Sequence, residues 1–201
     1  TIEQALSSKL FSEVVVSTDS KEIANVAKDS GAEVPFMRPD NLSDDFTTTD
    51  EALLHVINYF ENQSIFFNYV CCIYPVTPLL EAMDLQNSLD LLIKEEAISC
   101  FPVAEYSSSI YRALEITKED RVKILNEEFL TMRSQDLNKA YYDLGQFYWV
   151  NKDRYLEEKR VWSSDCVPYL VDKYKMIDVD TLEDWKHVEQ IFNFRNPDEQ
   201  K

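Results

Sequence analysis

Two aspartates near the C-terminus, Asp178 and Asp180, have the type and spacing that a metal-dependent reaction needs. They lie in a short apolar run, residues 176–180, just before an expected helix start. Side chains alternate along a strand, so both carboxylates point to the same side and can share one hard cation. Such a pair suits Mg²⁺, which prefers one or two carboxylates, several waters and the phosphate oxygens of a substrate. In a chain this acidic, an isolated pair is more often an exposed acidic turn, with Thr181 and Glu183 assisting the helix start.

The composition is that of a globular protein with an acidic surface. The chain has 201 residues, 45% of them hydrophobic, and can bury a sizeable core in one domain. The net charge of −17 argues against a general nucleic-acid-binding or anionic-membrane-binding surface, since both need basic patches. No apolar run approaches the roughly 20 residues that a membrane span needs. A bound polyphosphate would need a metal ion or a few focused arginines and lysines to offset this charge.

The cysteines and glycines narrow the possible chemistry. Cys71, Cys72, Cys100 and Cys166 show neither a Cys-x-x-Cys pair nor metal-ligand spacing, so we interpret them as reduced thiols of a cytoplasmic protein. With 2 glycines, these residues cannot form a glycine-rich phosphate loop. Carboxylates, arginines and a metal ion remain, which is the equipment of phosphoryl or nucleotidyl transfer.

The elements that must position these residues alternate between strand and helix. Short apolar runs predict strands at residues 14–16, 33–36, 69–74, 97–103 and 146–149 and around Asp178. Helical periodicity predicts four helices: one capped by Asp19 and Glu22, one capped by Thr48 and Glu51, one after Pro78, and one from Leu182 to Phe192. This βαβ succession predicts an α/β fold with a mostly parallel sheet and helices on both faces.

Residues 1–201 are expected to form a single domain with one excursion from the sheet, at about 105–143. The pattern there changes to short polar and aromatic segments. Within it, the runs 113–116 and 122–125 predict a hairpin around residues 118–120. We interpret this excursion as a small inserted lobe that serves dimerisation.

Seven segments, in order along the chain, carry a resemblance to a known family. They are VSTD (16–19), VPFMRP (34–39), LSDD (42–45), CIYPVTP (72–78), RSQDL (133–137), GQFYW (145–149) and IDVDT (177–181). Together they resemble the acylneuraminate cytidylyltransferases, and within that family most of all the pseudaminic acid cytidylyltransferases. The resemblance spans nearly the whole chain, which makes it more specific than any single motif.

The resemblance implies a Rossmann-like nucleotidyltransferase fold and the transfer of CMP from CTP to the anomeric hydroxyl of pseudaminic acid, giving CMP-pseudaminate and pyrophosphate. By position, Asp178 and Asp180 would hold Mg²⁺ and act in catalysis together with Arg133. The residues implied to face the nucleotide are Asp19, Arg38, Thr47 and Thr49, and those implied to line the sugar pocket are Tyr74, Thr77, Arg133 and Gln146. An arginine guanidinium can form two hydrogen bonds with the sugar carboxylate, and hydroxyl or amide side chains can form hydrogen bonds with the acetamido substituents.

Several of these residues have a second interpretation within the fold itself. Arg133 can pair with Asp136 or Asp143 instead of a ligand. Arg38 can simply sit in a turn before Pro39, and Tyr74 can be part of the core. Gln146 can form a hydrogen bond with a backbone group instead of contacting a ligand.

The substrate and the activity of these 201 residues also have alternatives. The sialic acid enzymes usually carry Gln-Pro-Thr-Ser-Pro where this chain has YPVTP at 74–78, which favours pseudaminic acid over a neuraminic or legionaminic relative. Family members open with a strand and a basic, glycine-containing loop that cradles the triphosphate, whereas this chain begins at Thr1, within the helix that would follow. We therefore expect either a fragment of a longer gene product or a non-catalytic nucleotide-binding remnant, with little activity from these residues alone.

Overall fold

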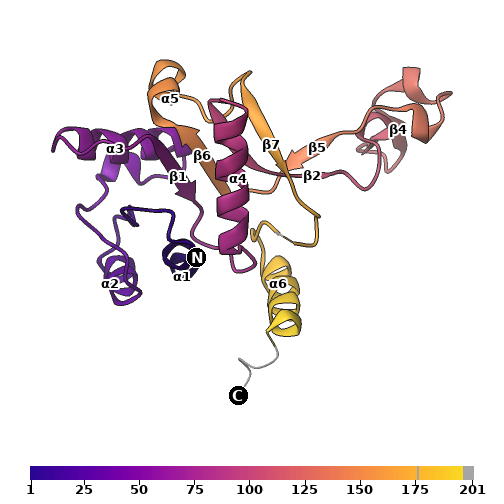
Figure 1. Ribbon diagram of the computed structural model, residues 1–201. Helices are drawn as coiled ribbons and strands as arrows, with labels where there is room; N and C mark the ends of the chain where they lie inside the picture. Colours follow the sequence, from indigo (N-terminus) through magenta and orange to yellow (C-terminus); the bar gives the residue numbers. More distant parts are fainter. Residues whose placement is uncertain (176, 197–201) are drawn as a thin grey trace.

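The computed structural model describes residues 1–175 and 177–196, which form a mixed α/β fold (Figure 1). The α-helices are α1 (Ile2–Ser8), α2 (Lys21–Asp29), α3 (Thr49–Glu61), α4 (Ala82–Lys94), α5 (Lys152–Glu158) and α6 (Leu182–Arg195). The strands are β1 (Tyr69–Ile73), β2 (Ser99–Glu105), β3 (Leu114–Ile116), β4 (Val122–Ile124), β5 (Tyr141–Asp143), β6 (Phe147–Asn151) and β7 (Cys166–Leu170). No helix in the described ranges has the length and apolar character needed to cross a membrane.

The main sheet is mostly antiparallel, so the mostly parallel sheet predicted from the sequence is wrong. Its strand order is β1-β6-β2-β5, with β7 paired to β2. Strand β6 is antiparallel to both β1 and β2, β5 is antiparallel to β2, and β7 pairs with β2 in parallel. Strands β1 and β2 therefore run in the same direction, as a β1-α4-β2 unit requires. The physical reason for the error is that β6 returns from the lobe and inserts between them.

Helices cover both faces of this sheet, as predicted. Helix α4 lies across one face (Figure 1), where a core cluster includes Leu85, Leu92, Phe147 and Trp149. Helices α3 and α5 contribute to a second cluster that includes Ile57, Tyr148, Val150 and Tyr155. Because successive residues of β6 point to opposite faces, this one strand contributes to both clusters.

Strands β5 and β6 are two arms of one bent segment. Strand β5 pairs with the last residues of β2, whereas β6 pairs with its first residues. Between the arms, Leu144 donates its N–H to the Pro102 carbonyl at 3.1 Å, and Tyr74 donates its N–H to the Gln146 carbonyl at 2.9 Å. Gly145 has a φ of +59°, a left-handed conformation that glycine adopts without steric cost. The chain therefore bends at Gly145, next to the end of β1.

Residues 106–140 leave the sheet and form a lobe that projects to one side (Figure 1). Strands β3 and β4 pair in antiparallel fashion, with Leu114 opposite Ile124, which confirms the predicted hairpin. None of these lobe residues is buried. Large apolar side chains are exposed on it, including Leu114, Ile116, Val122, Leu125 and Leu130.

The N-terminal third has less regular sheet than the sequence predicts. The runs at 14–16 and 33–36 form one parallel bridge, between Val15 and Glu33, rather than two strands. Two backbone hydrogen bonds hold this bridge, from Val16 N–H to the Glu33 carbonyl at 2.9 Å and from Glu33 N–H to the Val14 carbonyl at 2.8 Å.

One of the two predicted helix caps is confirmed. The Thr48 hydroxyl and the Glu51 carboxylate form a capping box at the start of α3. At α2 the cap is Ser20, whose hydroxyl accepts the N–H of Ile23, so the prediction of Asp19 as the cap is wrong. The helix begins at Lys21, and the cap must be the residue immediately before it.

Residues 171–181 connect β7 to α6 and are called the strap below. Their described residues contain no strand, so the strand predicted around Asp178 is wrong; Met176 lies outside the described residues. Exposure still alternates as predicted, with Asp178 and Asp180 exposed and Ile177 and Val179 half-buried. Strand geometry needs a ladder of backbone hydrogen bonds, and such a ladder ends at Val171, whose N–H donates to the Val103 carbonyl.

Candidate active site

A cavity of about 310 Å³ lies between the bend at Gly145 and the strap. Its lining comes from these two segments and consists of Tyr142, Asp143, Leu144, Lys173, Ile177 and Asp178. The Lys173 ammonium donates to the Ser107 hydroxyl at 2.5 Å, at the root of the lobe. The cavity therefore brings two carboxylates and one ammonium together where the sheet, the strap and the lobe meet.

The Asp178 carboxylate packs directly against Gly145. A Cβ atom at this glycine would lie 2.5 Å from Asp178 Oδ2 and 2.9 Å from its Cγ. Asp143 shapes the same bend, since its Oδ1 accepts the Gly145 N–H at 3.0 Å. Glycine is thus needed here for two reasons, the positive φ and the close approach of the carboxylate.

The surroundings of the Asp178 carboxyl disfavour its charged form. Partial burial raises the pKa of its carboxyl above the ordinary value, and the nearby negative charges of Asp180, Asp143 and Asp184 raise it further. A hydrogen bond from the Val179 backbone opposes the rise in this pKa without cancelling it. A cation placed at these carboxylates would relieve both effects, because it favours their charged forms.

The donor set at Asp178 and Asp180 fits Mg²⁺. Both carboxylates are exposed hard oxygen donors on the strap. The Asp178 carboxylate lies so close to Gly145 that no side chain would fit between them. Across residues 1–175 and 177–196, no three His, Cys, Asp or Glu side chains group closely enough to hold a metal by themselves. Mg²⁺ commonly uses one or two carboxylates and completes its octahedron with waters and substrate phosphates, so two carboxylates suffice.

A line of hydroxyl groups leads from α3 to this cavity. The Thr49 hydroxyl and the Tyr74 phenol share a hydrogen bond at 2.6 Å, and the Tyr74 ring lies 5.4 Å from the Tyr148 ring. The Tyr148 phenol donates to Asp143 Oδ2 at 2.5 Å. Burial and this carboxylate hold the pKa of Tyr148 far above its ordinary value, so the phenol keeps its proton. The two oxygens of Asp143 are thereby fixed, one by Tyr148 and one by Gly145.

Comparison with known proteins identifies the family. The cytidylyltransferase family matches residues 1–196. This chain belongs to the cytidylyltransferase family. It is 32% identical over 191 residues to the pseudaminic acid cytidylyltransferase of Campylobacter jejuni subsp. jejuni serotype O:23/36 (strain 81-176), which covers 95% of this chain and 82% of that protein. It is 27% identical over 194 residues to the CMP-N,N'-diacetyllegionaminic acid synthase of Legionella pneumophila, over 95% of this chain and 82% of that protein.

A solved structure shares the fold of this cytidylyltransferase. The structure of CMP:2-keto-3-deoxy-manno-octonic acid synthetase complexed with CTP matches with a TM-score of 0.67 and 12% identity, over 96% of this chain and 86% of that chain. At this identity the likeness shows the fold alone. Family membership makes the protein a nucleotidyltransferase that transfers CMP from CTP, which confirms the resemblance and the enzyme class predicted from the sequence.

The residues predicted to face the nucleotide in this cytidylyltransferase are only partly brought together. Arg38 Nη2 lies 3.9 Å from Asp19 Oδ1, so these two share one place. Thr47 instead closes a local turn, since its hydroxyl donates to Asp44 Oδ1 at 2.8 Å. That hydroxyl and adjacent backbone N–H groups lower the pKa of Asp44. Thr49 belongs to the line of hydroxyls that ends at the cavity.

The residues predicted for the sugar pocket also lie in different surroundings. Tyr74 lies on the same line of hydroxyls, whereas Thr77 is buried with its hydroxyl 2.8 Å from that of Thr1. The Nε2 of buried Gln146 donates to the carbonyls of Leu144 at 3.0 Å and Ile177 at 3.1 Å.

Arg133 lies on the lobe and is engaged in an exposed ion pair. Its Nε and Nη2 donate to the two oxygens of Asp136 at 2.7 and 3.1 Å, which is the alternative that the sequence left open. The guanidinium is thereby occupied by a neighbour three residues along the chain.

Sequence reasoning missed Asp143 and Lys173 as cavity residues. A local signal existed for Asp143, because an aspartate two residues before a glycine is typical of a turn in which its side chain accepts the glycine N–H. Lys173 had no such signal, since its place depends on how the strap runs past the sheet. The proximity of Gly145 to Asp178 was likewise invisible in the sequence.

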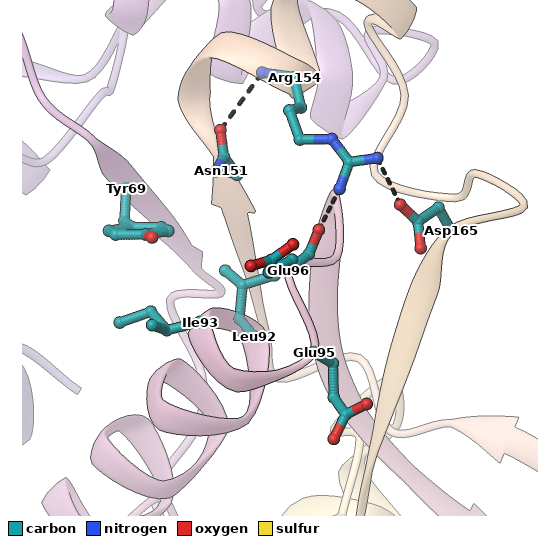
Figure 2. Close-up of a pocket in the computed structure, with 8 residues that line it drawn as sticks. All are labelled: Tyr69, Leu92, Ile93, Glu95, Glu96, Asn151, Arg154 and Asp165. Atoms are coloured by element: carbon teal, nitrogen blue, oxygen red, sulfur yellow. Dashed lines mark hydrogen bonds and ion pairs between the residues drawn. The ribbon is translucent and has the colours of Figure 1, made fainter.

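A larger cavity, of about 560 Å³, lies at the opposite end of the sheet. Tyr69 and Asn151, which line it, form the last pair of the β1–β6 ladder on the side away from the bend. Figure 2 shows Arg154 reaching across it to the Glu96 carbonyl and to Asp165, whose Oδ2 lies 2.5 Å from Nη2. The guanidinium therefore joins the turn after α4 to the loop before β7. None of the predicted site residues lines this cavity.

Proposed function

We propose that this cytidylyltransferase transfers CMP from CTP to pseudaminic acid. The observation that supports this sugar most directly is the 32% identity to the Campylobacter pseudaminic acid cytidylyltransferase over 95% of the chain. The YPVTP segment at 74–78 supports the same choice, because the resemblance to the sialic acid enzymes is weaker there. In the reaction the anomeric hydroxyl oxygen bonds to the α-phosphorus, the bond to the β-phosphate breaks, and pyrophosphate and a proton are released.

In this proposal Asp178 and Asp180 hold Mg²⁺ at the cavity. The ion supplies charge neutralisation on the triphosphate, which matters in a protein with a net charge of −17. Asp143 would fix the bend at Gly145 through its hydrogen bond at 3.0 Å, and the absence of a side chain on Gly145 would leave the space that the Asp178 carboxylate occupies. Asp19, Arg38, Thr47 and Thr49 stay predictions for the nucleotide contacts.

For the sugar, Gln146 has a free acceptor. Its buried Oε1 has no hydrogen-bond partner within the described part of the chain, and an unpaired buried oxygen is costly. An acetamido N–H of the sugar would satisfy it. Lys173 would meet the sugar carboxylate, because it is a cation among the described residues that line the cavity. Tyr74, Thr77 and Arg133 stay predictions as sugar ligands.

A legionaminic or neuraminic acid is the alternative substrate, and the 27% identity to the Legionella synthase favours the former. The test is pyrophosphate release from CTP and Mg²⁺, by a protein that also carries the expected N-terminal strand and basic loop, with pseudaminic acid, N,N'-diacetyllegionaminic acid and N-acetylneuraminic acid side by side. We expect a kcat/KM for pseudaminic acid roughly 10–100-fold above that for N-acetylneuraminic acid, because hydroxyls without partners are poorly accepted in a pocket shaped for a less polar sugar. Tyr74→Gln should narrow the difference. Equal kcat/KM values for the three sugars would contradict the substrate assignment.

We also propose a homodimer formed through the lobe. The exposed apolar side chains of the β3–β4 hairpin, among them Leu114 and Ile116, support this role, since such surface usually marks an interface. A cytoplasmic location, expected from the four free cysteines, completes the proposal.

A further inference from the structure

The strap, which carries the two aspartates proposed to bind the metal ion, has few backbone contacts with the sheet. Its first residue, Val171, donates its N–H to the Val103 carbonyl at 3.0 Å. Farther along, the Ile177 carbonyl accepts from Gln146 Nε2 at 3.1 Å. Between these two points no strand runs through the described residues, so side chains must hold the strap in place.

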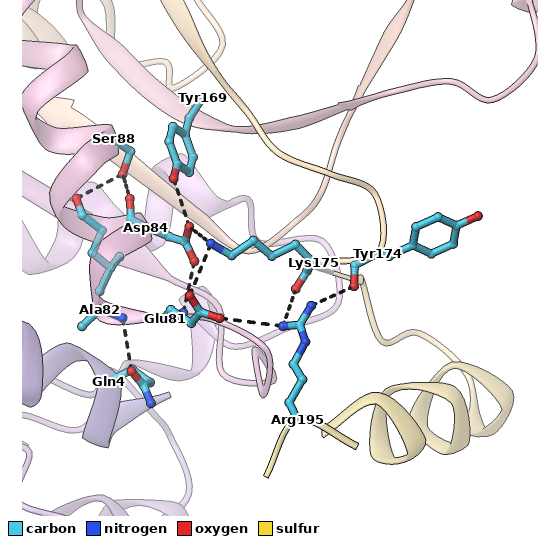
Figure 3. A network of polar contacts seen from close by, with 10 residues as sticks. Gln4, Glu81, Ala82, Asp84, Ser88, Tyr169, Tyr174, Lys175 and Arg195 are labelled. Atoms are coloured by element: carbon cyan, nitrogen blue, oxygen red, sulfur yellow. Dashed lines mark hydrogen bonds and ion pairs between the residues drawn. The ribbon is translucent and has the colours of Figure 1, made fainter. Parts of the chain in front are cut away.

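One strap side chain, that of Lys175, reaches a carboxylate in the protein interior (Figure 3). Its Nζ lies 2.6 Å from Oδ1 of Asp84 in the first turn of α4, and the Asp84 side chain is only 1% exposed. The Tyr169 phenol donates to the same oxygen at 3.0 Å, and Glu81 Oε2 lies 3.4 Å from the ammonium. A buried carboxylate needs such a partner, because an unpaired charge in the interior is strongly disfavoured.

Arg195, at the end of α6, holds the same part of the strap (Figure 3). Its guanidinium donates to the Tyr174 carbonyl at 3.2 Å and to the Lys175 carbonyl at 3.5 Å. It also lies 3.9 Å from Glu81 Oε1. Helix α4, the strap and helix α6 are thus tied together immediately before the two aspartates.

We infer that Lys175 is a positioning residue for the carboxylates of Asp178 and Asp180. Asp178 follows Lys175 by three residues, a span of at most about 11 Å in extended chain. Anchoring Lys175 on Asp84 therefore limits where Asp178 can lie, and the contact with Gly145 completes the placement. This inference rests on the proposed function, since it takes Asp178 and Asp180 as ligands of a divalent cation.

Replacing Lys175 should change the affinity for a divalent cation in opposite directions, depending on whether Lys175 positions the carboxylates or acts only through its charge. Lys175 is positively charged and by itself repels a cation at the neighbouring carboxylates. Replacing it with a neutral residue should then strengthen cation binding if only charge mattered. A positioning role predicts the opposite, since a displaced carboxylate no longer meets the ion.

The experiment measures Mn²⁺ binding to the purified protein, without CTP or sugar, from the electron paramagnetic resonance signal of the free ion. Lys175→Met should weaken Mn²⁺ binding about 10–100-fold, the usual effect of removing a group that orients a metal ligand. Lys175→Arg should stay near the original affinity, because a guanidinium can still pair with Asp84. The matched control is Lys186→Met on the exposed surface of α6, which should leave the affinity unchanged.

A second variant covers the case in which Lys175→Met leaves Asp84 unpaired and prevents folding. The double variant Asp84→Asn with Lys175→Met removes both charges and should show the same weakened Mn²⁺ binding. An unchanged or tighter affinity in either folded variant would overturn the positioning role, provided that Asp178→Asn does weaken Mn²⁺ binding. If Asp178→Asn also has no effect, the metal site of the proposed function is wrong, and the inference is wrong with it.

Discussion

Replacing Gly145 by alanine tests whether the bend between β5 and β6 sets the position of the Asp178 carboxylate. The added Cβ would lie 2.5 Å from Asp178 Oδ2, whereas ordinary contacts begin at 3.4 Å. The carboxylate must therefore move by about 0.9 Å, since the strap can shift more easily than the paired strands around the bend.

We expect Gly145→Ala to reduce kcat strongly and to lower the Tm only moderately. A misplacement of about 1 Å in a catalytic group can reduce the rate by about 100-fold, so we expect a loss of this size in kcat for pyrophosphate release. The backbone at a φ of +59° adds strain of about 1–2 kcal/mol when a side chain is present. For a protein of this size that strain lowers the Tm by about 2–8 °C.

The chain contains a matched control in Gly31, which also has a positive φ, of +91°. A Cβ there would meet the flexible side-chain end of Leu6 at 3.1 Å and none of the predicted site residues within 4 Å. Gly31→Ala should lower the Tm by a similar amount and leave kcat within about twofold of the original. Both kcat values are measured well below both Tm values, with saturating CTP and sugar. Equal kcat in Gly145→Ala and Gly31→Ala would refute the proposal that Gly145 sets the position of the Asp178 carboxylate.

Three further predictions concern the charges at Asp178 and Asp180 and the apolar surface of the lobe. In a protein that also carries the expected N-terminal strand and basic loop, Asp178→Asn and Asp180→Asn should each lower kcat by about a thousandfold or more at limiting Mg²⁺, because the site loses charge compensation for the triphosphate. In EDTA, Asp178→Asn should raise the Tm at pH 7. The raised pKa of Asp178 means that its stabilising contribution is complete below the unfolded-state value near pH 4 and is lost as the pH rises through the folded-state value. An Asn variant less stable than the original protein at pH 7 would contradict this. Separately, Ile116→Glu with Val122→Glu should convert a dimer to a monomer in sedimentation velocity, while Lys118→Glu on the hairpin turn should not; a dimer that persists would exclude the hairpin as the interface.

Much of the local structure could be predicted, because it depends on residues a few positions apart. The Thr48–Glu51 capping box and the β3–β4 hairpin are confirmed for this reason. The alternating exposure of Asp178 and Asp180 also follows from the local pattern, even though the strand predicted to produce it is absent from the described residues. The wrong cap at Asp19 shows the limit of such reasoning, since a shift of one residue changes which side chain can accept the helix N–H.

The family could also be inferred from the sequence, because seven short segments in a fixed order are far more specific than any one of them. Individual roles could not be inferred in the same way. Arg133 is paired with Asp136 in the structure, and the Gln146 amide supports the strap, although both were expected at the sugar. A side chain's partner depends on which backbone lies within reach after folding.

The sequence by itself determined helices α2, α3, α4 and α6, the hairpin, the acidic pair at Asp178 and Asp180, and the family, whereas it gave no prediction of α5. Only the tertiary structure decided that β6 inserts between β1 and β2, that Gly145 receives the Asp178 carboxylate, and that Lys175 pairs with Asp84, which is 91 residues away. These contacts have no local signature. Their free energy comes from burial, steric fit and the pairing of charges in the interior, and these terms exist only once distant segments have been brought together.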